Sequence, residues 1–401
     1  MNQAAHLILY GHDTFGLGHI RRNRKIASAL VDCYRDIRVT IITGSGLSGE
    51  YASHPRIDYV EIPPVEKLPD GRYKSGEGGL SYAETIAART QAIGALAQSQ
   101  PADIFIADKE PLGLGGELSV AIKHFKASGT TMVLGLRDVL DEATQLKKEW
   151  HKKGYFGALD NLYDQIWIYG SEQFYRPLEG LGLSEQVLEK CQYTGFLYQP
   201  NLEFELTPAM GLPKDYLLVT TGGGGDGDPL MDAVLNAYEN GSEIPCPSVL
   251  LLGPYSDSAY AEQVRQRAAG IDGIHVIGFD SEPEVLIRNA RAVIGMCGYN
   301  TFCEVIARNK PVLFVPRQMP RMEQFIRANR AKELGYCDVI LSADAANPDA
   351  MAHAIRQLID SSNLPPAKHD FDAAGLEYIC GQVGSILDER QQETLKVEPA
   401  L

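Results

Sequence analysis

The fold is decided by the stretch from Val293 to Arg330, which reads VIGMCGYNTFCEVIARNKPVLFVPRQMPRMEQFIRANR. An apolar run leads to Cys297, after which a helical pattern begins. A second apolar run, Val312 to Val315, ends at a proline, and another helical pattern starts at Glu323. Continuous apolar runs are typical of strands buried on both faces, and helices between such strands indicate a parallel sheet. The stretch therefore predicts a strand–helix–strand–helix unit of an α/β fold.

The same alternation extends over the whole chain. Strands are predicted at HLILY, VTIIT, DYVEI, DIFIAD, TMVLGLR and QIWIYG in the first half, and at YLLVTTG, SVLLLG, IHVIG, AVIGMCG and PVLFVP in the second. This pattern favours two Rossmann-like domains, each with a parallel sheet, that face each other across a cleft. We expect an acceptor-side domain at 1–200, a proline-rich linker at 201–213, a donor-side domain at 214–372 and a C-terminal helix with a polar tail at 373–401.

Composition narrows the classes of partner. The 401 residues carry a net charge of −15, which argues against nucleic acid as a partner. The seven cysteines include no Cys-x-x-Cys pair, so we expect free, buried thiols in a reducing, cytoplasmic protein. No apolar run approaches the roughly 18 residues that span a bilayer. Membrane contact is therefore expected to be at most peripheral, at the inner face.

The first loop follows a strand at Leu7–Tyr10 and reads GHDTFGLGHIRRNRK. Gly16 and Gly18 allow the backbone to approach a ligand closely, and His19 is expected to begin a helix and to point into the cleft. The dinucleotide fingerprint fails here because its third glycine is replaced. The alternative is a tight strand–helix turn with a solvated basic face, formed by Arg21, Arg22, Arg24 and Lys25.

A glycine run opens the second half as TTGGGGDGDP. Its backbone N–H groups could cradle a diphosphate. A nicotinamide cofactor is disfavoured because no acid ends the next strand. Asp226 and Asp228 form an Asp-x-Asp that could bind a divalent metal or only cap a helix, and we expect neither metal nor cofactor. The predicted diphosphate contacts are Gly222, Gly223, Gly224 and Gly225.

Several motifs together resemble one family. They are Gly18-His19, the glycine run, Cys297-Gly298-x-x-Thr301-x-x-Glu304, PVLFVP and Glu323-Gln324. This set resembles the inverting two-Rossmann (GT-B) nucleotide-sugar glycosyltransferases, especially those similar to the peptidoglycan N-acetylglucosaminyltransferase of family 28. The arginine-rich segment after PVLFVP resembles a branch of predicted glycosyltransferases. The resemblance covers most of the second domain and the first loop, and it leaves the middle of the first domain unmatched.

The resemblance implies roles for individual residues. Glu304 would hold the ribose hydroxyls of a UDP-sugar, and Phe279 would lie near the base of the nucleotide. Three residues depart from the family pattern: Cys297 replaces serine, Glu323 replaces glutamine and Arg327 replaces asparagine. The implied donor contacts are Gly298, Asn300 and Thr301 near the diphosphate, and Glu323 and Gln324 at the sugar hydroxyls. Arg317, Arg321 and Arg327 would hold a charged sugar or an extra phosphate, or would be surface cations that balance an acidic protein.

The acceptor side needs a general base, and three residues at predicted strand ends qualify: His19, Asp108 and Asp138. Lys109 and Arg137, their neighbours, are candidate substrate contacts, although polar groups at strand ends often serve only as caps or ion pairs. We expect transfer of a hexose-type sugar, with inversion, from a UDP-sugar to an unidentified sugar- or lipid-linked acceptor. The alternatives are a nucleotide-sugar 2-epimerase, which would need no acceptor, and a non-catalytic nucleotide-sugar-binding protein.

Overall fold

The computed structural model describes residues 4–13, 16–51, 53–68, 72–76, 78–200, 211–241, 243–361 and 370–397. Its internal contacts divide the chain into two compact units. Unit 1 contains residues 1–14, 19–198 and 372–401, and unit 2 contains residues 15–18 and 199–371. Most of the linker predicted at 201–213 lies outside the described residues.

Unit 1 is built on a parallel sheet with the strand order β3-β2-β1-β6-β7-β8-β9. The strands of this sheet are β1 (Ala5–Gly11), β2 (Ile37–Thr43), β3 (Ile57–Glu61), β6 (Ile104–Asp108), β7 (Thr131–Arg137), β8 (Gln165–Tyr169) and β9 (Cys191–Tyr193). A separate antiparallel hairpin pairs β4 (Val65–Lys67) with β5 (Tyr73–Ser75). The helices are α1 (Gly18–Cys33), η1 (Ser48–Glu50), α2 (Tyr82–Ser99), α3 (Ser119–Ala127), α4 (Ala143–Lys153), α5 (Tyr155–Asn161), α6 (Glu185–Glu189) and α14 (Gly375–Val397).

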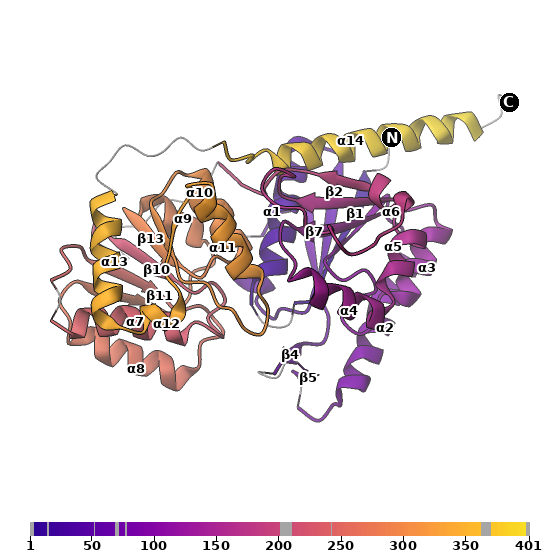
Figure 1. Ribbon diagram of the computed structural model, residues 1–401. Helices are drawn as coiled ribbons and strands as arrows, with labels where there is room; N and C mark the ends of the chain where they lie inside the picture. Colours follow the sequence, from indigo (N-terminus) through magenta and orange to yellow (C-terminus); the bar gives the residue numbers. More distant parts are fainter. Residues whose placement is uncertain are drawn as a thin grey trace. The chain divides into compact units, whose positions relative to one another are not determined.

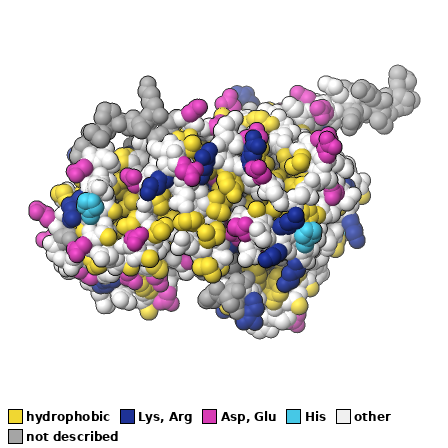
Figure 2. Space-filling view, in the orientation of Figure 1, with side chains coloured by type: hydrophobic (Ala, Val, Ile, Leu, Met, Phe, Trp, Pro, Cys, Tyr) yellow, Lys and Arg dark blue, Asp and Glu magenta, His cyan; other side chains and the backbone are white. Residues whose placement is uncertain are grey.

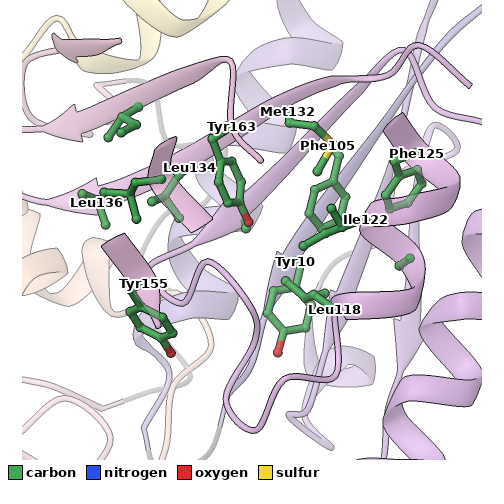
Figure 3. Packing of buried hydrophobic residues seen from close by; sticks show 14 of the residues in the cluster. Tyr10, Phe105, Leu118, Ile122, Phe125, Met132, Leu134, Leu136, Tyr155 and Tyr163 are labelled. Atoms are coloured by element: carbon green, nitrogen blue, oxygen red, sulfur yellow. The ribbon is translucent and has the colours of Figure 1, made fainter. Parts of the chain in front are cut away.

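The core of unit 1 explains why its central strands are apolar throughout. Phe105 of β6 stacks on Phe125 of α3 with ring centroids 4.7 Å apart, and Leu118 and Ile122 pack in the same cluster. Figure 3 shows these side chains around Tyr10 of β1. The Tyr10 hydroxyl donates a 2.7 Å hydrogen bond to a buried carboxylate, Glu117. Burial on both faces leaves only the strand ends to carry polar chemistry.

The last helix returns to the first unit. Tyr34, which follows α1, donates its hydroxyl proton to the carbonyl of Cys380 in α14 at 2.7 Å. Arg390, further along α14, pairs with Asp103 at 3.5 Å. Figure 1 shows α14 beside the strands of unit 1. The C-terminal helix is thus part of the first unit, although it follows the second unit in the sequence.

Unit 2 is built on a second parallel sheet, with the order β12-β11-β10-β13-β14-β15. Its strands are β10 (Leu217–Thr220), β11 (Ser248–Leu251), β12 (Ile274–Ile277), β13 (Ala292–Gly295), β14 (Val312–Phe314) and β15 (Asp338–Val339). Its helices are α7 (Asp228–Glu239), α8 (Ser258–Ala269), α9 (Pro283–Asn289), α10 (Tyr299–Ala307), α11 (Glu323–Glu333), α12 (Ser342–Ala345) and α13 (Pro348–Ser361). Figure 1 shows α7, α8, α12 and α13 on one face of this sheet and α9, α10 and α11 on the other.

The prediction of an α/β fold with a parallel sheet in each half is confirmed. In both sheets, the strand order reverses direction beside the first strand, since β1 lies between β2 and β6, and β10 lies between β11 and β13. Parallel sheets bind ligands at the carboxyl ends of the strands, next to such a reversal. The loops after β1, β6, β10 and β13 are therefore the positions to examine.

The surface corrects one expectation and adds one observation. Cys33 is exposed, so the prediction of buried thiols is wrong for this residue, although all seven cysteines are free. The acidic balance is also not uniform, since Figure 2 shows cationic side chains gathered over α4, where Lys147, Lys148 and Lys152 are exposed. Among the helices that the structure describes, none combines the length and the apolar character needed to cross a bilayer.

Candidate active site

The loops after β1 and β6 bring His19 and Asp108 together in unit 1. His19 lies in the first turn of α1, which begins one residue earlier than expected, and Asp108 is the last residue of β6. The His19 Nδ1 atom is 2.7 Å from Asp108 Oδ2, although the residues are 89 positions apart. The His19 side chain is 15% exposed, whereas that of Asp108 is fully buried. Of the three candidate bases, the histidine and one aspartate thus form a pair.

Arg22 completes this pair from the next turn of α1. Its Nε and Nη2 atoms donate to Asp108 Oδ2 at 3.1 and 2.7 Å, and Nη2 also lies 3.1 Å from His19 Nδ1. Burial by itself would raise the pKa of Asp108, but the charges of Arg22 and His19 more than offset this and lower the pKa to about 2. Asp108 is therefore ionised at neutral pH.

The cations that follow His19 are not a solvated face. Arg21, Arg22 and Lys25 are all buried, at 8%, 1% and 6% exposure. That alternative interpretation of the first loop is therefore wrong for these three residues. The apolar residues Ile20, Ala27, Leu30 and Val31 of the same helix are also buried.

His12 and Asp13 precede α1 and contact its first turn. The ring centroids of His12 and His19 are 4.1 Å apart. Burial, and next the charge of His19, lower the pKa of His12 well below its ordinary value, so His12 is a neutral neighbour. Asp13 accepts the backbone N–H of Ile20 at 3.0 Å and the hydroxyl of Thr43 at 2.6 Å. These contacts fix the first turn of α1, which carries His19.

The other unit 1 candidates lie at neighbouring strand ends. Asp138 follows Arg137, the last residue of β7, and is 1% exposed. Lys109 adopts a left-handed φ of 75°, which is uncommon for a residue other than glycine. Its Nζ atom is 3.2 Å from Glu110 Oε1, and Glu110 also pairs with Lys153 at 3.0 Å. Lys109 therefore takes part in a partly buried ion cluster.

In unit 2, the glycine run connects β10 to α7. Gly222 and Gly224 have φ values of 72° and 92°, which favour glycine. A side chain at Gly224 would also clash with the carbonyl of Leu252, so this glycine has a packing role in addition to any ligand role. Gly227 precedes α7, and among the described side chains none caps that helix. Gly223 is partly exposed and Gly225 is exposed.

The turn after β13 lies beside the glycine run, because β13 pairs with β10. Cys297 has a φ of 63°, a conformation that is strained for cysteine. Arg327 of α11 donates to the Cys297 carbonyl at 2.9 Å and is fully buried. The interpretation of Arg327 as a surface cation is therefore wrong. It contacts the backbone of the turn that opens α10, and it lies over the ring of Tyr299 at 5.7 Å.

Helix α10 carries the residues expected to face the donor. Gly298 is its N-cap residue, and within the described part of the chain its amino terminus has no side-chain cap. Asn300 and Thr301 in its first turn are 7% and 8% exposed. Glu304 is fully buried and pairs with Arg308 at 3.3 Å. Glu304, the residue expected to bind the ribose, thus already has a cationic partner in Arg308, at the end of the same helix.

The loop after β14 reaches the same strand ends. Arg317 forms an ion pair with Asp226 of the glycine run, and its Nη2 atom is 3.7 Å from Glu323. The backbone N–H of Arg317 donates to Gln324 Oε1 at 3.2 Å. Glu323 and Gln324 are 6% and 8% exposed. The structure therefore brings the glycine run and the arginine-rich segment together.

The remaining donor candidates have less defined surroundings. Arg321 and Phe279 are half-buried, the first in the loop after β14 and the second after β12. Within the described residues, His, Cys, Asp and Glu side chains do not form a group that could hold a metal ion.

Sequence reasoning missed Arg22, His12 and Asp13 as members of the unit 1 cluster. A helical period would have placed Arg22 beside His19, since residues three positions apart share a face. Nothing in the local pattern indicated that Asp108, and not Asp138, would be their partner.

Comparison with known proteins fits this geometry. Residues 217–375 match the model of the Glycosyltransferase family 28 C-terminal domain. No curated protein matches the sequence of the chain. Similar solved structures include the calicheamicin glycosyltransferase CalG4, with 17% identity, a TM-score of 0.57 and 100% of both chains covered. Another is TcCGT1 in complex with UDP, with 13% identity, a TM-score of 0.60 and coverage of 96% of this chain and 99% of that one.

A third similar structure is a putative UDP-N-acetylglucosamine 2-epimerase from Listeria monocytogenes, with 14% identity, a TM-score of 0.60 and 100% of both chains covered. At such low identities these likenesses show a shared fold, whereas the family match shows the type of the C-terminal domain. The family 28 match to the C-terminal domain, on a chain with this fold, supports a nucleotide-sugar glycosyltransferase of the GT-B type whose C-terminal domain is similar to that of family 28.

Proposed function

We propose that this enzyme transfers a hexose-type sugar from a UDP-sugar to a hydroxyl of a sugar- or lipid-linked acceptor. The transfer inverts the anomeric carbon and uses neither a metal ion nor another cofactor. The observation that carries the proposal is the 2.7 Å contact between His19 Nδ1 and Asp108 Oδ2 at the carboxyl ends of β1 and β6. A histidine oriented by an ionised carboxylate is a general base.

The base supports inversion for a chemical reason. With Nδ1–H donated to Asp108, the Nε2 atom of His19 can accept the proton of the acceptor hydroxyl. The acceptor oxygen then forms a bond to the anomeric carbon as the bond from that carbon to the diphosphate oxygen breaks. One displacement of this kind inverts the carbon, and the nucleoside diphosphate leaves with the bonding electron pair.

Unit 2 offers groups for the departing diphosphate. The glycine run supplies bare backbone, and the open amino terminus of α10 adds helix-dipole N–H groups. Arg317 contributes a cation at the same strand ends. Its ion pair with Asp226 supports transfer without metal, because that carboxylate already has a positive partner. We assign binding of the ribose to Glu304 and contact with the nucleotide base to Phe279. Binding of the sugar hydroxyls is assigned to Glu323 and Gln324.

The nucleotide is assigned by analogy. TcCGT1 was solved with UDP, and the Listeria monocytogenes protein is described as acting on UDP-N-acetylglucosamine. A thermal-shift screen across UDP-, GDP-, dTDP- and CMP-sugars tests this assignment. We expect the UDP-sugars to give the largest rise in melting temperature. A larger rise with another nucleotide would replace UDP in the proposal.

Activity is then measured with the donor so identified and a panel of sugar- and lipid-linked acceptors. The anomeric coupling constant of the product, measured by NMR, should correspond to the configuration opposite to that of the donor. A retained configuration would contradict the proposed role of the base. An isomer formed from UDP-N-acetylhexosamine without acceptor would favour the 2-epimerase, and binding without turnover would favour a non-catalytic protein.

A further inference from the structure

The contact of Arg22 with the His19–Asp108 pair has a consequence for catalysis. Arg22 is 1% exposed, so its guanidinium is not placed to bind a substrate from solvent. It donates two hydrogen bonds to Asp108 Oδ2, the oxygen that also contacts His19 Nδ1. Its Nη2 atom is 3.1 Å from that ring nitrogen. One carboxylate oxygen is therefore shared between a permanent cation and the proposed base.

This sharing matters because a general base must be unprotonated at the working pH. A carboxylate next to a histidine favours the imidazolium, by about 1–3 pH units when the two are in contact. An uncompensated Asp108 would thus favour the protonated form of the ring, which cannot accept a proton. The guanidinium of Arg22 opposes that effect, since like charges 3.1 Å apart repel each other strongly in a buried site.

The other groups around His19 do not provide this compensation. His12 is held neutral by burial. Asp13, from the loop after β1, is a further ionisable neighbour, and burial raises its pKa. Its carboxylate favours a protonated His19 and acts in the same direction as Asp108. Arg22, in contrast, is a cation in contact with the ring.

Arg22 also bears on the tautomer. Nδ1 can donate to Asp108 or accept from Arg22, but not both, because it carries either a proton or a lone pair. The ionised carboxylate at 2.7 Å makes the stronger, charge-assisted bond, so Nδ1 carries the proton and Nε2 carries the lone pair. Arg22 binds Oδ2 beside the ring and so holds that oxygen next to Nδ1.

We propose that Arg22 is a positioning residue that offsets the charge of Asp108 beside His19 and points the Nε2 lone pair of His19 at the acceptor. The proposal rests on the assignment of His19 as the base. It deepens that assignment by replacing a two-residue pair with a three-residue arrangement whose charges nearly cancel. The sequence signature is His-x-x-Arg at the start of the first helix, together with an aspartate that ends a neighbouring strand.

The test is a titration of the ring of His19 by NMR, on protein with isotopically labelled histidine, in the full-length wild type and in Arg22→Met. The His19→Gln spectrum assigns the resonance. We expect the His19 midpoint to rise by about one pH unit or more in Arg22→Met, and to stay near wild type in Arg22→Lys, which retains the charge. This readout needs neither donor nor acceptor, so it stands apart from the proposed reaction.

A matched control comes from the same helix. Arg24 lies over the ring of Tyr51 at 4.3 Å, and Arg24→Met removes one positive charge from α1 at a different place. The His19 midpoint should stay within about 0.3 unit of wild type there, because the charge is more distant and better screened. An equal shift in Arg24→Met and Arg22→Met would reduce the effect of Arg22 to general electrostatics and overturn the proposal.

A double variant distinguishes a specific effect of the Arg22 charge from misfolding. Arg22→Met leaves Asp108 buried without its cation, whereas Arg22→Met with Asp108→Asn removes both charges. The double variant should return the midpoint towards wild type. Where transfer activity is measured, the acidic limb of the kcat/KM–pH profile should move upwards in Arg22→Met with the NMR midpoint. An unchanged midpoint in Arg22→Met, or one that the double variant does not restore, would refute the role of Arg22.

Discussion

Arg327 donates a hydrogen bond of 2.9 Å to the carbonyl of Cys297, and this contact connects helix α11 to the turn that opens helix α10. The guanidinium is fully buried, and the turn has a left-handed φ at Cys297. A strained turn persists only where its surroundings hold it. The arginine that replaces the family's asparagine therefore has a structural task beside the proposed donor site.

Replacement of Arg327 by leucine tests that task. We expect a loss of about 1.5–3 kcal/mol in the free energy of unfolding, because a hydrogen bond to a charged group is lost. Nucleotide affinity should fall as well, since the turn carries the first residues of α10. Urea unfolding and calorimetry measure the two effects. Arg330→Met removes an ion pair with the exposed Glu333 and is the control. It should change the free energy of unfolding and the nucleotide affinity very little. Full nucleotide affinity in Arg327→Leu would separate the turn from the donor site.

The ion pair between Glu304 and Arg308 allows the ribose assignment to be tested separately from stability. Each charged hydrogen bond is worth roughly 1.5–3 kcal/mol, so Glu304→Gln should weaken nucleotide binding about tenfold or more. Breaking a buried ion pair also destabilises the fold, and Arg308→Met should do so to a similar degree. Calorimetry measures the nucleotide affinity of both variants. Equal loss of affinity in the two would mean that Glu304 only supports the helix.

His19→Ala tests the proposed base. General-base contributions are typically about 10²–10⁴-fold, so turnover should fall by a factor in that range. Donor affinity should stay near wild type, because the proposed donor contacts lie in unit 2. Turnover and donor binding are compared in the same preparation. Turnover within a few-fold of wild type would refute His19 as the base and leave Asp108 or Asp138 as the candidates.

Chelation tests the absence of a metal requirement. Activity and nucleotide binding should survive EDTA, because backbone N–H groups and Arg317 can neutralise the diphosphate. Asp226→Asn should cost stability through its ion pair with Arg317 and should create no demand for metal. Activity that is lost with EDTA, recovered with Mn²⁺ or Mg²⁺, and abolished in Asp226→Asn with Asp228→Asn would restore the metal interpretation.

The pKa of Asp108 predicts a pH dependence of stability. Burial would raise this pKa, but Arg22 and His19 lower it to about 2 in the folded protein. An aspartate in an unfolded chain titrates near about 3.9. The folded value is the lower one, so ionised Asp108 stabilises the fold above about pH 4, and this contribution disappears as the pH falls through about 2. The shift corresponds to about 2.5 kcal/mol.

Urea unfolding of wild type and Asp108→Asn between pH 5 and pH 2 measures that contribution. The difference in the free energy of unfolding between the two proteins should shrink by about 2 kcal/mol over this interval, because part of the carboxylate is still ionised at pH 2. A difference that does not depend on pH would mean that Asp108 contributes through packing alone.

Much of the architecture could be predicted from local patterns. The strands at Leu7–Tyr10 and Val312–Val315 are continuous apolar runs, and a run of that kind is stable only between two layers of helices. The glycines at Gly222 and Gly224 were recognisable because a left-handed backbone excludes most other residues. Such features depend on residues close in the sequence, so the sequence by itself determined the parallel sheets and the loops that carry polar groups.

The partners of those polar groups were decided by tertiary structure. Asp108 and Asp138 follow similar strands, yet β6 lies next to β1 in the sheet and β7 does not, so Asp108 contacts His19. Strand order arises from the packing of the whole domain, which local periodicity does not record. The same holds for Arg22 and Arg327, which read as surface cations in the sequence. Their burial follows from carboxylate and carbonyl partners that the chain supplies 86 and 30 residues away.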